Sequence, residues 1–233
     1  MLPQLVKLKG AALDFLFPQR CLGCGEEGNL LCHTCQKHLP RIVPPICPQC
    51  GRPQSSGIIC PGCVTRQCYI DGIRSPLKFD GIVREAIHQL KYKNLRSLVD
   101  PLSSFLVDYL AGNPLPFEVL VPVPLHSKRL RERGYNQSFL LAQELGRRLN
   151  LPVVNNSLVR VKYILPQAKT KSAEERHNNV KQAFSCCNSD LQNARILLID
   201  DVCTSGATLE ACAAPLKLSG AASVWGLTLA REI

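Results

Sequence analysis

The sequence predicts an α/β domain with a mostly parallel sheet, preceded by a small cysteine-rich module. From about residue 71 onward, short apolar runs alternate with helical patterns, an order that builds a parallel sheet covered by helices on both faces. Before that point, nine of the thirteen cysteines lie within residues 21 to 68. We therefore divide the 233 residues into an N-terminal amphipathic helix (1–20), a cysteine-rich module (21–70) and an α/β domain (71–233).

Composition limits the class of the protein and of its partners. Hydrophobic residues make up 45% and charged residues 20% of the chain, which is ordinary for a globular protein and excludes a disordered or fibrous class. The formal net charge of +10 favours anionic partners such as phosphates, nucleotides or nucleic acid. Charge alone does not choose among these partners.

The first residues have the pattern of an amphipathic helix over 2–17. Its apolar stretch GAALDFLF is interrupted by Asp14 and is too short to span a bilayer, so we expect no transmembrane segment here. Packing in a core or interface is favoured, with an anchor at the membrane surface as the alternative. Because no export signal is present, we expect a cytoplasmic protein, with a place at the inner face of the membrane as the alternative.

Eight cysteines form four CxxC pairs, a spacing that lets two thiolates reach one tetrahedral ion from a single turn. A reducing compartment disfavours disulfides, and four repeats exceed what a redox motif needs, so zinc is favoured over these two alternatives. Two pairs fill one site, which predicts two closed, structural Zn²⁺ ions. The simplest assignment joins neighbouring pairs, and a cross-braced pairing stays open. The predicted ligands are Cys21, Cys24, Cys32, Cys35, Cys47, Cys50, Cys60 and Cys63.

Helices in the α/β domain are predicted where apolar residues repeat with helical spacing. They are expected over 82–90, from Asp100, over 136–149, from Ser172 and over 208–218. Asp100 followed by Pro101 is a typical helix start, Asn136 is a typical cap, and Ser172 opens a capping box. Pro215 is expected to bend the last helix.

Strands are predicted where short apolar runs are bounded by prolines or turn residues. They are expected over 119–124, 158–161, 195–199 and 223–230. The run RILLI, at 195–199, has the continuous apolar character of a strand buried on both faces. In open α/β sheets, ligands bind beyond the carboxyl ends of such strands.

Two adjacent acids, Asp200 and Asp201, follow this buried strand and precede a loop of small and hydroxyl residues. Backbone N–H groups of such a loop and the positive end of the next helix bind phosphate. Two carboxylates would repel a bare phosphate, so we expect them to face ribose hydroxyls and Mg²⁺. The loop matches neither a Walker motif nor a dinucleotide fingerprint. An acidic pair alone is often only a turn feature, and the loop is what favours a ligand site.

At these residues the chain resembles a known family. ILLIDDVCTSGAT is similar to the 5-phosphoribosyl 1-pyrophosphate (PRPP) motif of type I phosphoribosyltransferases. The resemblance extends over nearly the whole chain to the ComF/GntX-like branch, in which cysteine-rich ribbons precede such a domain. VPVPLHSKRLRERGYNQSFLLA, at 121–142, resembles that branch's PVPL...RGFNQ segment, with Tyr135 in place of the commoner Phe. The resemblance implies a sheet of the type I phosphoribosyltransferase kind behind a double zinc ribbon.

The resemblance also implies roles for individual residues. Asp200 and Asp201 would hold the 2- and 3-hydroxyls of PRPP, with Mg²⁺ bound alongside. The 5-phosphate would be bound by Thr204, Ser205, Gly206, Ala207 and Thr208. The pyrophosphate would meet the loop after VPVP, at Lys128, Arg129 and Arg133, although a basic run is a solvated face in most proteins. The segment 162–174 resembles the mobile loop that closes over the site, and Gln167 and Arg176 match the family pattern in and just after it.

Two functions follow from the resemblance. In the first, the chain is an enzyme that transfers phosphoribosyl from PRPP to a nitrogen acceptor and releases pyrophosphate, in DNA uptake or in nucleotide salvage. In the second, it is a non-catalytic module of the same fold that binds single-stranded DNA or proteins of the competence machinery, since family members are linked to DNA uptake. Aromatic residues are only 6% of the chain, which disfavours a single-strand binder. The acceptor and the oligomeric state stay open.

Overall fold

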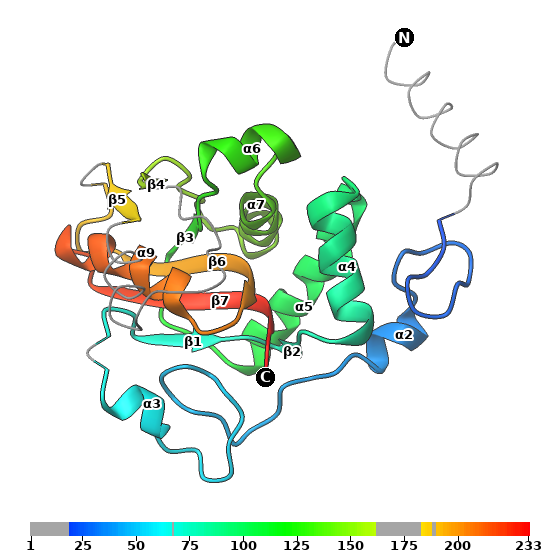
Figure 1. The fold of residues 1–233 in the computed structure, drawn as a ribbon, viewed down its shortest axis with the longest axis horizontal. Coiled ribbons are helices and arrows are strands. Elements are labelled where there is room, and N and C mark those ends of the chain that lie inside the picture. Colours follow the sequence, from blue (N-terminus) through cyan, green and yellow to red (C-terminus); the bar gives the residue numbers. More distant parts are fainter. Residues whose placement is uncertain (1–18, 67, 162–182, 188–189) are drawn as a thin grey trace, which may run out of the picture.

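The computed structural model describes residues 19–66, 68–161, 183–187 and 190–233. At its centre lies a parallel sheet in the order β1-β7-β6-β3, with β2 also paired to β7 (Figure 1). Its strands are β1 (Gly72–Arg74), β2 (Leu77–Lys78), β3 (Val119–Pro122), β6 (Arg195–Cys203) and β7 (Ser223–Arg231). Every pairing in this sheet is parallel, as the alternation of strands and helices predicts.

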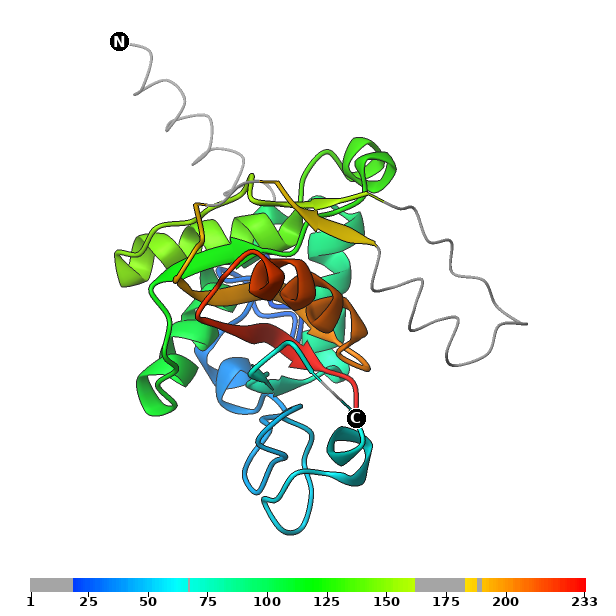
Figure 2. The same ribbon diagram turned by 90° about the vertical axis from the view of Figure 1, so that its left-hand side faces the viewer.

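Helices cover both faces of the sheet, as Figures 1 and 2 show. On one face, α4 (Gly81–Tyr92), α5 (Val99–Gly112) and α7 (Gln137–Leu149) pack on side chains such as Leu197 and Leu227. On the other face, α9 (Ala207–Leu218) packs on Ile196 and Leu198. Because β6 is covered on both sides, its apolar run is continuous and its residues 196–199 are fully buried.

Most predicted elements of the α/β domain are confirmed. The helix expected over 136–149 is α7, and the Asn136 side chain accepts a hydrogen bond from the Ser138 N–H at its start. The strand expected over 195–199 continues through both acids to Cys203, because its pairing with β7 runs to that residue. Pro215 lies inside α9.

Other elements differ from the prediction. The helix expected from Asp100 starts at Val99, since a 3₁₀ turn (Arg96–Leu98) leads directly into it. The strand expected over 158–161 is β4 (Leu158–Arg160), and it pairs with β5 (Phe184–Cys186) in a separate antiparallel sheet. The pattern from Ser172 lies outside the described residues except for its last two, Ala183 and Phe184, and Phe184 begins β5 instead of ending a helix. The expected helix over 2–17 also lies outside them.

The basic segment after β3 was expected as a loop and is instead a short helix, α6 (Ser127–Arg133). His126 caps its start, and the Nδ1 atom of that residue accepts a hydrogen bond from the Lys128 N–H. Gly134 ends the helix with φ of 79°, a left-handed conformation that favours glycine. Charged residues in five of its seven positions hid the helical pattern, because no apolar stripe of this helix is buried.

The first cysteine ribbon shares a core with the α/β domain. Its only assigned helix among the described residues is α2 (His33–Lys37), which lies near the foot of α4 in Figure 1. Leu31, Cys35 and Leu39 belong to the same buried cluster as Val83 and Ala86 of α4. A Cβ atom on Gly23 would lie 2.6 Å from the Ile82 side chain of α4, which shows how closely the two parts meet.

The second cysteine ribbon lies against the edge strand β1 and contains α3 (Pro61–Val64) (Figure 1). The Gln49 carbonyl accepts a hydrogen bond of 2.8 Å from the Ile73 N–H of β1. Gly51 has φ of 71°, and a Cβ atom there would lie 2.4 Å from the Ile73 carbonyl oxygen, so only glycine fits. Both ribbons are therefore packed on the sheet domain. The boundary at residue 70 between the cysteine-rich module and the α/β domain stays a prediction from the sequence.

Candidate functional site

The two acids of β6 lie at the carboxyl edge of the central sheet, where parallel strands end. Asp200 is opposite Thr228 in the pairing of β6 with β7, and Asp201 is buried, with 4% of its surface exposed. The loop 204–206 and the start of α9 follow within a few residues. The structure thus places the acids and the loop at the edge of the sheet that the sequence predicts.

Asp200 is held by a hydrogen bond from another element. Ser138 Oγ, in the first turn of α7, donates to Asp200 Oδ1 over 2.8 Å, and the Asp201 N–H donates to the same oxygen over 2.9 Å. Burial and the neighbouring charge of Asp201 raise the pKa of Asp200 to about 7, although the hydrogen bonds from Ser138 and Asp201 oppose that shift. Near neutral pH this carboxyl group therefore gains or loses a proton easily.

Asp201 is paired with a cation from α4. Lys91 Nζ lies 2.9 Å from Asp201 Oδ2, and only 5% of the Asp201 side chain is exposed. Lys91 is in the last turn of α4, where a positive charge interacts favourably with the helix dipole. The two neighbouring acids therefore have different environments, one bonded to a hydroxyl and the other to an ammonium group.

The loop after the acids exposes hydroxyl groups beside the start of α9, where the Ser205 hydroxyl oxygen accepts a hydrogen bond of 3.3 Å from the Ala207 N–H. Thr204, Ser205 and Thr208 are exposed, and Gly206 precedes α9 with φ of 84°. A Cβ atom at Gly206 would lie 2.9 Å from the Ile73 side chain, so the turn requires glycine for conformation and for space. This combination of hydroxyls, a tight turn and the start of a 12-residue helix is chemically suited to a phosphate group.

A buried arginine lies beneath the start of this loop. Arg231, at the end of β7, is 1% exposed, and its Nη1 lies 2.8 Å from the sulfur of Cys203. Its Nε and Nη2 atoms have no hydrogen-bond partner within the described residues. Burial raises the pKa of Cys203, so the thiol stays neutral and does not compensate the arginine. Arg231 therefore adds a positive charge near the loop that no carboxylate of the described residues pairs with.

The basic residues of α6 line a pocket with the end of α4. The pocket has a volume of about 580 Å³ and includes Arg129 and Arg133 but not Lys128. Its lining consists of Lys91, Tyr92, Asn94, Arg129, Glu132, Arg133 and Tyr135. The structure thus brings two of the three basic residues expected for pyrophosphate into one pocket with Lys91, the partner of Asp201.

Two other predicted site residues, Gln167 and Arg176, lie outside the described residues. Sequence reasoning missed Ser138 and Lys91, which contact the acids from α7 and α4. A serine two residues after a helix cap and a lysine at a helix end are both common, so neither carries a signal in the sequence. Only the folded chain brings them to the acids.

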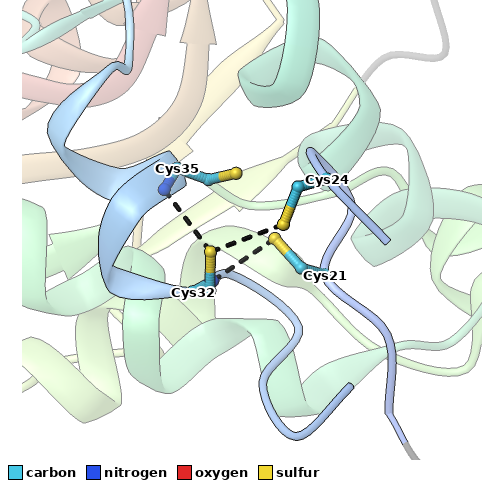
Figure 3. A group of neighbouring side chains, drawn as sticks. All are labelled: Cys21, Cys24, Cys32 and Cys35. Atoms are coloured by element: carbon cyan, nitrogen blue, oxygen red, sulfur yellow. Dashed lines mark hydrogen bonds between the residues drawn. The ribbon is translucent and has the colours of Figure 1, made fainter. Parts of the chain in front are cut away.

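The first cysteine group gathers the sulfur atoms of two CxxC turns in one place (Figure 3). The sulfurs of Cys21, Cys24, Cys32 and Cys35 lie within 4.8 Å of one another. A tetrahedral zinc ion with Zn–S bonds of about 2.3 Å requires sulfurs about 3.8 Å apart. The Cys24 and Cys32 sulfurs are 3.6 Å apart, so the group fits zinc. Burial opposes ionisation of Cys21, but backbone N–H donors such as that of Cys32 lower its pKa to about 6.

The second group repeats this arrangement. The sulfurs of Cys47, Cys50, Cys60 and Cys63 also lie within 4.8 Å of one another, and those of Cys50 and Cys60 are 3.8 Å apart. Neighbouring CxxC pairs therefore combine, and the cross-braced alternative is excluded. With four thiols from the protein in each group, no position is left for water, and both zinc sites are structural.

No helix in the described part of the chain could cross a bilayer.

Comparison with known proteins agrees with this architecture. Residues 12–64 match the model of the double zinc ribbon domain. The chain is 34% identical to competence protein ComFC of Bacillus subtilis, over 91% of this chain and 89% of that protein. The chain belongs to the ComF family. It is also 34% identical to competence protein F of Haemophilus influenzae, over 92% of this chain and 98% of that one.

Other members and solved structures extend the comparison. This ComF-family chain is 30% identical to the DNA utilization protein YhgH of Escherichia coli K12, over 91% of the chain and 94% of that protein. Among solved structures, purine phosphoribosyltransferase from Pyrococcus horikoshii is similar with a TM-score of 0.37 and 19% identity. The match covers 57% of this chain and 72% of that one. The family assignment rests on the sequence identity to the ComF-family relatives.

Proposed function

We propose that this chain binds PRPP at the carboxyl end of β6 and transfers its phosphoribosyl group to a nitrogen acceptor, releasing pyrophosphate. One observation carries the proposal. A paired, partly buried set of acids, Asp200 and Asp201, lies directly before an exposed hydroxyl loop that turns at Gly206 into the first turn of α9. Few ligands need both the carboxylates and the phosphate-binding loop, and a sugar phosphate is one of them.

Each part of the ligand has a matching part of the site. The ribose hydroxyls would donate hydrogen bonds to Asp200 and Asp201, and the 5-phosphate would accept bonds from the N–H and hydroxyl groups of Thr204, Ser205, Gly206, Ala207 and Thr208. The buried charge of Arg231 supports an anion at that loop. The pyrophosphate would lie toward Arg129, Arg133 and Lys128 of α6.

Carboxylate oxygens are the ligands that Mg²⁺ prefers. Burial and the charge of Asp201 raise the pKa of Asp200, and a bound cation would favour its charged form. When bound with PRPP, Mg²⁺ would neutralise part of the charge on the pyrophosphate. The residues of the chain do the rest by positioning and electrostatics. As the bond between C1 and the pyrophosphate oxygen breaks, its electron pair leaves with that oxygen and the new bond forms from nitrogen to C1. The nitrogen releases its proton to water, and the α6 cations stabilise the growing negative charge on the pyrophosphate.

Isothermal titration of PRPP with Mg²⁺ tests the site. Changing Asp200 and Asp201 together to Asn should lower the affinity for PRPP by at least tenfold while the fold is kept, because each lost charge-assisted hydrogen bond is worth about 1.5 kcal/mol or more. The matched control is Asp108→Asn, which removes a carboxylate from an exposed position on α5. Equal affinity in the wild type and the double variant would contradict the assignment. Pyrophosphate release in the presence of a panel of nucleobases then tests catalysis.

A second function is supported by a different observation. The relatives ComFC, competence protein F and YhgH are named for competence and DNA utilization, and this chain has a net charge of +10. A non-catalytic module would bind single-stranded DNA or competence proteins through its basic surface. Binding of an oligonucleotide that weakens steeply with salt, together with no pyrophosphate release under any acceptor, would favour this function over transfer.

A further inference from the structure

The pocket between α4 and α6 adjoins the acidic pair through one side chain, Lys91. It is lined by three cations, Lys91, Arg129 and Arg133, against a single acid, Glu132. A volume of about 580 Å³ is within the range of small-molecule sites. Since opposite charges attract, these cations favour a small polyanion as the occupant of the pocket.

The position of Lys91 in this pocket is well determined by its neighbours. Leu90, the preceding residue, is fully buried, and its carbonyl accepts a hydrogen bond from the Tyr135 hydroxyl. Tyr135 follows α6 and is itself buried, so the last turn of α4 is tied to the end of α6. The Lys91 side chain is 21% exposed, which leaves its ammonium group accessible from the pocket.

The Lys91 ammonium group can therefore interact on two sides, with Asp201 on one side and with a ligand in the pocket on the other. Its Nζ lies 2.9 Å from Asp201 Oδ2, so the charges of Lys91 and Asp201 compensate each other when no other cation is bound to the acids. Without Lys91, the pocket's cationic side chains are Arg129 and Arg133. If a ligand takes over the charge or the hydrogen bonds of Asp201, the ammonium group becomes available to the pocket. Occupation of the acids and occupation of the pocket are thereby coupled through one side chain.

We propose that Lys91 is a leaving-group residue, which pairs with Asp201 in the free protein and binds the diphosphate of the sugar donor in the pocket. This inference rests on the proposed function and adds a residue to it. During transfer, the bond between C1 and the diphosphate oxygen breaks and its electron pair stays on the diphosphate. The Lys91 ammonium group stabilises that charge without giving up a proton, so no co-reactant is needed. Arg129 and Arg133 bind the same group from α6.

The test is titration of pyrophosphate with Mg²⁺, of PRPP with Mg²⁺ and of ribose 5-phosphate against the full chain. Lys91→Met should lower the affinity for pyrophosphate and for PRPP about tenfold or more, because a hydrogen bond to a charged group is lost. The affinity for ribose 5-phosphate should change by less than about threefold. Lys91→Arg should recover most of the loss because it keeps the cation. The matched control is Lys93→Met, an exposed lysine two residues away that does not line the pocket.

The outcomes separate this inference from the proposed function. If Lys91→Met binds pyrophosphate as tightly as Lys93→Met, or if the wild type binds no pyrophosphate, Lys91 is not a leaving-group residue. Failure of the wild type to bind ribose 5-phosphate, with pyrophosphate still bound through Lys91, would count against the proposed function and leave the assignment of the pocket in place. A thymidine oligonucleotide is the fourth ligand to titrate, because the phosphates of its backbone could bind to the same cations as pyrophosphate. Loss of oligonucleotide binding in Lys91→Met with unchanged pyrophosphate affinity would assign the pocket to nucleic acid and overturn the inference.

Discussion

Ser138 Oγ donates a hydrogen bond of 2.8 Å to Asp200 Oδ1 and so joins the first turn of α7 to the carboxyl end of β6. The residues are 62 positions apart in the chain. Because a hydrogen bond to a carboxylate favours its charged form, this contact limits how far burial and Asp201 raise the pKa of Asp200. The contact thus favours the charged form of Asp200 near neutral pH.

Removing that hydroxyl should shift the titration of the site. In Ser138→Ala, the pKa of Asp200 should rise above its value of about 7, so that binding of PRPP with Mg²⁺ reaches its maximum at a higher pH than in the wild type. Affinity measured from pH 6 to pH 9 would reveal the shift. Ser104→Ala, on α5, is the control and should leave the profile in place. A profile in Ser138→Ala that matches the wild type would show that the bond does not influence the acid.

Asp200 should also make stability depend on pH. Its pKa is raised from 3.8 to about 7 by burial and by Asp201, so the folded state holds a proton that the unfolded state has released between these values. The favourable contribution of the protonated acid is complete below about pH 4 and is lost as pH rises through about 7. In Asp200→Asn the free energy of unfolding should fall less between pH 4 and pH 8, as urea denaturation would measure. The Asp108→Asn variant should keep the wild-type slope, and a wild-type slope in Asp200→Asn would be the contrary result.

Zinc removal should destabilise the whole chain and not the ribbons alone. Cys35 belongs to the buried cluster that contains α4, so loss of its metal site exposes part of the core of the sheet domain. Cys35→Ser should reduce zinc from two ions to one per chain and lower the melting temperature of the single main transition, because structural zinc contributes on the order of 10 kcal/mol to folding. Elemental analysis and calorimetry measure both effects. Cys187→Ser, at an exposed thiol outside both groups, should change neither.

The turn before α9 should not tolerate a side chain. Gly206→Ala places a Cβ atom at φ of 84° and 2.9 Å from the Ile73 side chain, which should cost about 1–2 kcal/mol of unfolding free energy and weaken PRPP binding. Gly112→Ala is the control, because nothing lies within 4 Å of a Cβ atom there, at the end of α5. It should be neutral or slightly stabilising. Chemical denaturation and PRPP titration test the pair, and equal behaviour of the two variants would show that the turn adapts.

The sequence alone determined the elements whose signal is local. The four CxxC pairs predicted two zinc sites because each pair carries two of the four ligands of a site within one turn. The cap at Asn136 and the apolar pattern after it predicted α7, which is likewise a local signal. The apolar run before Asp200 predicted a buried strand, since burial on both faces leaves a continuous run. These features depend on neighbours along the chain, and the structure confirms them.

Only the tertiary structure decided which distant residues meet. Lys91 and Ser138 reach the acids because α4 and α7 pack on the same face of the sheet, and no pattern within α4 or α7 encodes that contact. The pairing of β4 with β5 outside the main sheet depends likewise on residues more than twenty positions apart. The first ribbon shares a core with α4 through apolar side chains that would serve equally well in an independent module. Local patterns specify elements, whereas the partners of each element are set by packing over the whole fold.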